Sequence, residues 1–160
     1  MGYSRPEEGS FDAGAARIAI IAARWNADIT DSLLDGALRA LARHGLEDKA
    51  VDVYRVPGAF ELPIASQRAA KTERYSAVIA LGCVIRGDTP HFDYVCAETT
   101  RGIGEVSLRH NIPVAFGLLT TDNHEQALAR AGNNPDNKGE EAALSMLELL
   151  TVFSHMDGEW

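Results

Sequence analysis

The chain has 160 residues, of which 46% are hydrophobic and 24% charged, a composition typical of a folded domain and not of a disordered one. Its 15 basic and 23 acidic side chains give a net charge of −8, which excludes nucleic-acid binding by phosphate neutralisation. No apolar run reaches the roughly 18 residues of a membrane-spanning helix, so no membrane partner is expected. One α/β domain is expected over residues 16–160, after a flexible polar arm over residues 1–15.

Strand and helix patterns alternate along the chain. Short apolar segments rich in β-branched residues predict strands at residues 17–23, 50–56, 77–85 and 113–121. Apolar residues at helical spacing predict helices at residues 29–44, 60–73, 91–110, 123–131 and 138–154. Nearly continuous apolar strands suit a parallel sheet buried on both faces. The order predicts a three-layer α/β/α domain with a four-stranded, mainly parallel sheet.

The last predicted helix is apolar around most of its circumference. Over residues 142–153 the only polar side chains are Ser145, Glu148 and Thr151, which form one narrow stripe. A sheet covers only one side of such a helix. Packing on neighbouring helices is one explanation, and cover by another subunit is the one we favour.

The cysteines and histidines exclude some kinds of site. Cys83 and Cys96 lie in apolar segments without CxxC spacing, which indicates reduced thiols in a cytoplasmic protein. The five histidines show no metal-binding spacing, so no metal site is expected.

Polar and aromatic side chains follow each predicted strand. In open parallel α/β sheets, ligands bind beyond the carboxyl ends of the strands. After the first strand, Trp25 offers a ring for stacking, and after the second, Glu61 offers a carboxylate for a helix cap or a polyol. These segments predict where a ligand site lies.

The end of the third strand is the most informative. Thr89 is predicted as an N-cap, with Pro90 at the first helical position and His91 in the first turn. Free backbone N–H groups there suit a phosphate, and an imidazole suits proton transfer. A capped helix with a surface histidine is the simpler alternative. Lys138, at the start of the last helix, is disfavoured by the helix dipole, which indicates either a function or a solvated lysine.

Several blocks of the sequence resemble the lumazine synthase family. They are ARWN (23–26), VPGAFELP (56–63), ALGCVIRGDTPHFDYV (80–95), PVAFGLLTTDNHEQALARAG (113–132) and NKG (137–139). The resemblance runs in order from about residue 16 to residue 154. It implies the flavodoxin-like form of the α/β/α fold.

The resemblance also implies an enzyme, a transferase that needs no cofactor. Members of this family condense 5-amino-6-(D-ribitylamino)uracil with 3,4-dihydroxy-2-butanone 4-phosphate. The product is 6,7-dimethyl-8-ribityllumazine, and phosphate and water are released. This is the penultimate step of riboflavin biosynthesis, and we expect the same activity here.

Each candidate site residue takes its role from the resemblance. His91 is implied as the acid/base, and Arg130 as the cation for the phosphate. Trp25, where the family more often has phenylalanine, is implied to stack on the pyrimidine. Phe116 is implied to come from an adjacent subunit, and Lys138 to lie near the substrates. The other implied contacts are with the ribityl chain and nearby ring (Ala59, Phe60 and Glu61), the ring pocket (Cys83, Val84 and Ile85) and the phosphate (Asp88 and Thr89).

Two features bear on the details of this assignment. Asp88 places a carboxylate beside the phosphate site, so only its backbone is expected to help binding. The linker that contains Pro135 is as short as in family members that form sixty-subunit shells. The resemblance therefore implies a homopentamer, with a shell of twelve pentamers as its larger form and riboflavin synthase as a candidate partner.

Two readings from other classes stay open at this point. One is a noncatalytic flavin-binding or storage shell of the same fold, which substrate turnover separates from an enzyme. The other is a flavodoxin-like signalling domain. That domain needs acidic residues after the first strand, where this chain has Arg24, Trp25 and Asn26.

Overall fold

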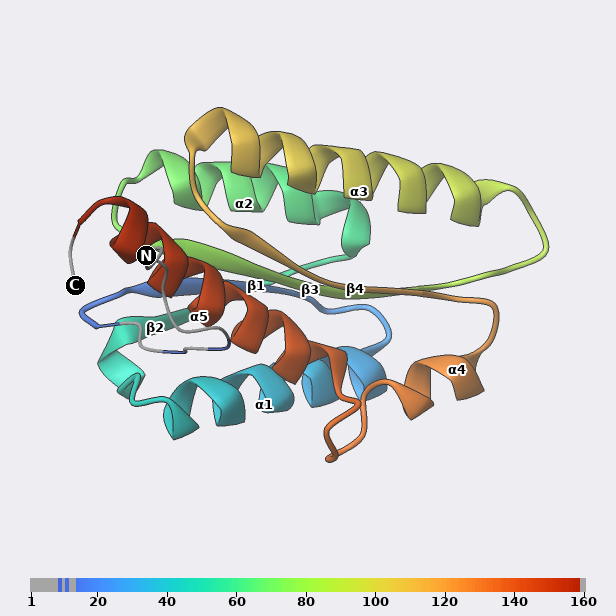
Figure 1. Ribbon diagram of the computed structural model, residues 1–160. Helices are drawn as coiled ribbons and strands as arrows, with labels where there is room; N and C mark the ends of the chain where they lie inside the picture. The colour runs from blue at the N-terminus through green and yellow to red at the C-terminus, as the bar shows by residue number, and fades with distance from the viewer. Residues whose placement is uncertain (1–8, 10, 12–13, 159–160) are drawn as a thin grey trace, which may run out of the picture.

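The computed structural model describes residues 9, 11 and 14–158, so most of the predicted arm over residues 1–15 lies outside the described residues. Figure 1 shows one sheet between two layers of helices. Every predicted strand and helix is present, with ends that differ by a few residues. The elements are β1 (Ile18–Ala23), α1 (Ala27–Arg43), η1 (Asp48–Ala50), β2 (Val51–Val56), η2 (Ala59–Glu61), α2 (Leu62–Lys71), β3 (Ala77–Ile85), α3 (His91–His110), β4 (Val114–Thr121), α4 (His124–Ala129) and α5 (Lys138–Met156).

The predicted four-stranded sheet is confirmed, and its strand pairs are all parallel. The strand order is β2-β1-β3-β4, which is a flavodoxin-like order. The chain adds β2 on one side of β1 and then crosses to add β3 on the other side, so the strand order switches direction between β1 and β3. Ligands in such sheets bind outside the carboxyl ends of the strands at this switch point. The topology therefore directs attention to the residues that follow β1 and end β3.

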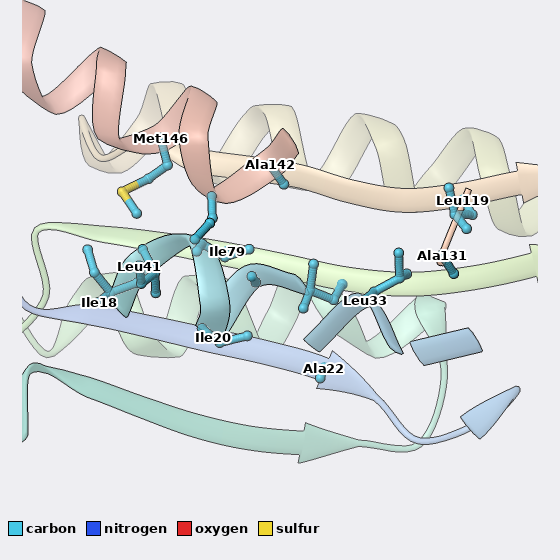
Figure 2. Packing of buried hydrophobic residues seen from close by; sticks show 14 of the residues in the cluster. Ile18, Ile20, Ala22, Leu33, Leu41, Ile79, Leu119, Ala131, Ala142 and Met146 are labelled. Carbon is cyan, nitrogen blue, oxygen red and sulfur yellow. The ribbon is translucent and has the colours of Figure 1, made fainter. Parts of the chain in front are cut away.

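The two faces of the sheet are buried under different helices (Figure 1). Helices α2 and α3 cover one face, and α1, α4 and α5 cover the other. Side chains of β1 alternate between them, so Ile18 and Ile20 join the cluster under α1 and α5, whereas Ile21 joins the cluster under α2. Figure 2 shows the first cluster, including Leu41 and Met146. Each fully buried large aliphatic side chain contributes roughly 1.5–3 kcal/mol, so the sheet is a firm base for a site.

Helices α1 and α5 approach each other closely at the NKG block. A Cβ on Gly139 would lie 2.6 Å from the carbonyl carbon of Leu33, so only glycine fits there. Asn137 is fully buried, and its Nδ2 donates to the Ser32 carbonyl at 3.1 Å. Its Oδ1 accepts from the Glu140 N–H at 3.0 Å and caps α5. This block therefore fixes where α5, with Lys138 in its first turn, begins.

Strand β2 is more exposed than its sequence predicts. It lies at the edge of the sheet, and Val53 and Tyr54 are exposed. Burial on both faces holds for β1 and most of β3. It is wrong for β2, whose successive exposed residues Val53 and Tyr54 face opposite sides of the sheet, and for the first part of β4, the other edge strand, where Phe116 is exposed.

Two helix starts also differ from prediction. The helix expected from residue 60 begins as the 3₁₀ turn η2, and α2 follows with Pro63 in its first turn, where a missing N–H costs nothing. The prediction of Thr89 as N-cap of α3 is wrong. The helix begins one residue later, at His91, and Pro90 takes the cap position. The Thr89 hydroxyl accepts only a long hydrogen bond, 3.4 Å, from the His91 N–H.

Helix α5 has the predicted apolar circumference. Met146 and Leu147 are buried against the sheet and α1, whereas Leu149 and Met156 are exposed. Cover of this outer side by another subunit stays a prediction.

Candidate functional site

A cavity of about 610 Å³ opens at the carboxyl ends of β1 and β3, at the switch point of the sheet. Small-molecule sites typically measure roughly 300–1,000 Å³. We call this space the histidine cavity. The predicted site residues that line it are Trp25, Ala59, Phe60, Cys83, Val84, Ile85 and His91. The structure therefore brings together one half of the expected site from three different parts of the chain.

Trp25 is held as a platform at the mouth of this cavity. Its N–H donates to the Pro57 carbonyl at 2.9 Å, which ties it to the end of β2. The next residue, Asn26, has a left-handed backbone (φ 58°), and its Nδ2 donates to the Cys83 carbonyl at 2.9 Å. The indole packs over Gly58, where a Cβ would lie 2.6 Å from ring atom Cζ3. The ring is nevertheless 58% exposed, so one face is open to a ligand.

Of the two roles predicted for Glu61, the structure shows the capping role, and contact with a polyol stays a prediction. The Oε1 of Glu61 accepts a hydrogen bond from the Gly58 N–H at 2.9 Å, and its own N–H donates to the Gly58 carbonyl at 3.2 Å, so Glu61 caps the start of η2. Glu61 does not line the cavity, whereas its neighbours Ala59 and Phe60 do. In this chain the carboxylate shapes the turn that presents those neighbours.

His91 is the first residue of α3, and its side chain lines the histidine cavity. Among the described residues, no side chain or backbone group hydrogen-bonds to its imidazole. Asp88 and Thr89 lie on the exposed loop that leads into α3 and line neither this cavity nor the one described next. The imidazole is therefore available to a ligand, beside a loop of free backbone groups.

A second cavity of about 360 Å³ lies along β4, α4 and the start of α5. We call it the arginine cavity, because Arg130 lines it together with Phe116 and Lys138. The Arg130 guanidinium donates to the Gln126 carbonyl at 2.8 Å, and no carboxylate of the described residues pairs with it. Lys138 Nζ contacts Glu141 Oε2 at 2.7 Å, which offsets the dipole penalty of its position. The predicted site is thus divided within one chain between two cavities.

The thiols near the histidine cavity are poor nucleophiles. Burial raises the pKa of the Cys83 thiol to about 11, and burial also raises the pKa of Cys96. Both cysteines are free. Because the thiolate is the reactive form, covalent catalysis through these residues is disfavoured at neutral pH.

Two further searches of the described residues, 9, 11 and 14–158, gave negative results. No group of three or more histidine, cysteine or acidic side chains is placed to hold a metal ion. No helix in this part of the chain is both long and apolar enough to cross a membrane.

Sequence reasoning missed some residues of the histidine cavity. On α3, Tyr94, Val95 and Glu98 line it at three, four and seven residues after His91. That is the spacing of one helix face, so the signal was present in the sequence. Asn26 and Gly58 also line the cavity. Asn26 reaches the cavity through its left-handed backbone, and Gly58 through its contact with the Trp25 ring. The spacing of residues in the sequence does not predict either feature.

Fold and site together define a parallel α/β protein that offers a small molecule an aromatic platform and an imidazole. A family model described as 6,7-dimethyl-8-ribityllumazine synthase matches residues 15–154. A protein of that name from Desulfovibrio desulfuricans is 51% identical over 148 residues, which cover 92% of this chain and 95% of the relative. Another, from Nitratidesulfovibrio vulgaris, is 52% identical over 149 residues, 93% of this chain and 96% of the relative. The chain belongs to the 6,7-dimethyl-8-ribityllumazine synthase family, as its motifs predicted.

Proposed function

We propose that the protein condenses 5-amino-6-(D-ribitylamino)uracil with 3,4-dihydroxy-2-butanone 4-phosphate to 6,7-dimethyl-8-ribityllumazine, the penultimate step of riboflavin biosynthesis. Family membership and the names of the relatives support this reaction. The observation that carries it is the histidine cavity, in which an open indole face and an unpartnered imidazole share one space. The two free cysteines fit a reducing compartment, and we place the protein in the cytoplasm.

The histidine cavity takes the pyrimidine. The indole of Trp25 stacks on the planar ring, and the end of β3 (Cys83, Val84 and Ile85) forms the floor beneath it. Ala59 and Phe60, presented by the capped turn η2, lie along the ribityl chain. This arrangement leaves the amino group of the pyrimidine on the side of α3, where His91 begins the helix.

The chemistry needs two substrates in register and a group that moves protons. The amine attacks the ketone carbon, and loss of water gives an imine. Elimination of phosphate then generates a second carbonyl, which the ribitylamino nitrogen attacks, and loss of a second water closes the ring. Holding the substrates together supplies up to roughly 7–11 kcal/mol of the barrier. His91 adds proton transfer, which is typically worth about 10²–10⁴-fold. His91→Ala is therefore expected to slow turnover by about that factor with both substrates still bound, and a loss beyond about 10⁵-fold would contradict this division.

A second copy of the chain completes the site. The ketone carries a phosphate, and the protein carries a net charge of −8, so the phosphate needs a local cation. Within one chain the candidate cation, Arg130, lies in the arginine cavity and not in the histidine cavity. A neighbouring copy that brings Phe116, Arg130 and Lys138 over the mouth of the histidine cavity supplies the missing half. A cyclic head-to-tail contact repeats this pairing around a ring. We propose a homopentamer, with the sixty-subunit shell and riboflavin synthase as its further predicted associations.

Turnover is the direct test of the reaction. The purified protein is mixed with both substrates, and product is followed by lumazine fluorescence. Signal that depends on both substrates is expected. Bound flavin without turnover would overturn the proposal in favour of the noncatalytic storage shell.

Complementation tests the shared site. His91→Ala chains, expected to turn over slowly, and Arg130→Ala chains, expected to bind the phosphorylated ketone weakly, are co-expressed in equal amounts and assayed at a low ketone concentration. If every site takes the imidazole from one chain and the guanidinium from the next, roughly a quarter of the sites in random rings regain both groups. If both groups come from one chain, no site regains them and activity stays at the level of the single variants, which would refute the shared site.

Arg130→Ala has a further specific expectation. Loss of the guanidinium should weaken binding of the phosphorylated ketone selectively, because a bidentate ion pair is removed. An equal loss of affinity for the ribitylaminouracil would show that the assigned role is wrong.

A further inference from the structure

Arg86 lies at the junction of β3 with the loop that leads to α3, and it makes contacts in three directions. Its backbone N–H donates to the Thr121 carbonyl at 2.8 Å. Its Nε donates to Asp122 Oδ1 at 2.9 Å, and its Nη1 donates to Asp93 Oδ1 at 3.3 Å. The guanidinium carbon also stands 4.4 Å from the centroid of the Phe92 ring. One side chain therefore joins β3, the first turn of α3 and the turn after β4.

These contacts flank a loop that, apart from the Pro90 carbonyl accepting from the Asp93 N–H at 2.9 Å, makes few hydrogen bonds among the described residues. Residues 87–90 carry Gly87, which has open space around it, and the long hydrogen bond of Thr89. Phe92 and Asp93, the two partners of Arg86 on α3, directly follow His91. Fixing their position fixes the direction in which the helix, and with it the imidazole, starts.

The anchor on the other side is firm. The Asp122 N–H donates to Gln126 Oε1 at 2.7 Å, and Asn123 Oδ1 accepts from the Gln126 N–H at 2.9 Å. The Thr121 hydroxyl donates to the Asn123 carbonyl at 2.9 Å. The turn between β4 and α4 is thus a closed set of hydrogen bonds, to which Arg86 adds one more.

We propose that Arg86 is a positioning residue that holds the His91 end of α3 and the adjoining loop in place against the turn between β4 and α4. The inference deepens the proposed function and rests on it, because it assigns to Arg86 the placement of the group that moves protons. Arg86 itself lines neither cavity.

The ion pairs of Arg86 are too exposed to contribute much to the free energy of unfolding, so folding stability does not explain why this arginine is present. The side chains of Arg86, Asp93 and Asp122 are 46%, 63% and 65% exposed, and pairs in such surroundings contribute little to folding. Geometry explains the choice of residue better. A planar guanidinium donates in two directions while its face rests on an aromatic ring, and a lysine ammonium does not. Loss of Arg86 should therefore impair the reaction more than the fold.

The test uses the full chain with Arg86→Gln, which keeps a planar polar group but loses the fork and the charge. Its kcat is expected to fall by about 10- to 100-fold, because misplacement of a reacting group by about 1 Å costs that much. Affinity for the ribitylaminouracil should stay near that of the unaltered protein, since the Arg86 side chain does not line the cavity that holds the pyrimidine. Arg86→Lys should recover only part of the loss.

Two controls separate positioning from structure. Arg109→Gln removes a different exposed arginine, one that lies on α3 and pairs with Glu105 at 2.6 Å, and it should leave kcat unchanged. The second control repeats Arg86→Gln in the His91→Ala background. If Arg86 acts through His91, the second substitution changes kcat by less than about twofold there, because coupled residues are not additive.

Each outcome decides the proposal. An equal fall of kcat with and without His91, or an unchanged kcat in Arg86→Gln, overturns it. If Arg86→Gln does not fold, Asp122→Asn and Asp93→Asn each weaken one arm of the contact and are read against His91→Ala in the same way. A protein that shows no turnover before any substitution refutes the proposed function instead, so the two failures are distinguishable.

Discussion

Gly58→Ala is the sharpest perturbation of the ligand platform that the structure offers. A Cβ at this position would lie 2.6 Å from Cζ3 of Trp25, well inside van der Waals contact, so the indole must move. The backbone of Gly58 is extended (φ −141°), and alanine adopts it without strain. The Gly58 N–H that binds Glu61 is also kept. The substitution therefore displaces the ring while leaving the turn intact.

The expected size of the effect follows from the stacking contact. Aromatic stacking is worth about 0.5–1.5 kcal/mol beyond area burial. Its loss corresponds to a dissociation constant that is about 2- to 13-fold weaker for the ribitylaminouracil. The free energy of unfolding should change by less than about 1 kcal/mol, because alanine also restricts the unfolded chain. Calorimetric titration with the pyrimidine alone measures the first quantity, and urea unfolding measures the second.

Gly104→Ala is the matched control, because a Cβ there meets nothing within 4 Å. It should leave affinity unchanged and stabilise α3 by about 0.5–1 kcal/mol. If Gly58→Ala folds normally and binds the pyrimidine as tightly as the unaltered protein, Trp25 is not the stacking platform.

Three further predictions concern the packing and the thiols. Asn137→Ala removes the cap of α5 and the hydrogen bonds that Nδ2 donates to the Ser32 and Gly132 carbonyls, so the free energy of unfolding should fall by about 2–4 kcal/mol; a change below about 1 kcal/mol would contradict the role of these hydrogen bonds. Gly139→Ala should cost about 1–3 kcal/mol through its clash with Leu33, visible as a lower melting temperature, and an unchanged melting temperature would show that α5 moves freely. Because the pKa of Cys83 is raised to about 11 from the ordinary 9.0, the stability linked to its neutral thiol is complete below about pH 9 and is lost as the pH rises toward 11. Alkylation of Cys83 followed by mass spectrometry should accelerate over the same interval, and a plateau by about pH 9 would refute the raised pKa.

The regular elements could be predicted because their signals are local. The run over residues 77–85 is apolar throughout and is a buried strand with the bounds expected. Gly45 follows the first helix with a positive φ of 88°, a conformation common just after helix ends and suited to glycine, so this stop is also a local signal. Exposure of β2 could not be predicted this way, because whether a strand lies at an edge depends on the order of all the strands.

The candidate site was predicted less evenly. Proximity of Trp25 and His91 follows from the rule that strands of a parallel sheet end at one edge. Separation of Arg130 from His91 depends on which side of the sheet each helix covers, and neither residue type nor spacing encodes it. Glu61 illustrates a different limit, because a carboxylate that caps a turn and one that binds a polyol look alike in sequence.

The close approach of α1 and α5 has a consequence for how this chain can vary over generations. Any single-base change that replaces Gly139 introduces a side chain where a neighbouring carbonyl already stands. Packing alone therefore disfavours every substitution at this position, whatever the role of Lys138 beside it. In the segment Asn137-Lys138-Gly139, helix capping and helix packing therefore account for the first and third residues. Only Lys138 is free to be determined by the chemistry of the site.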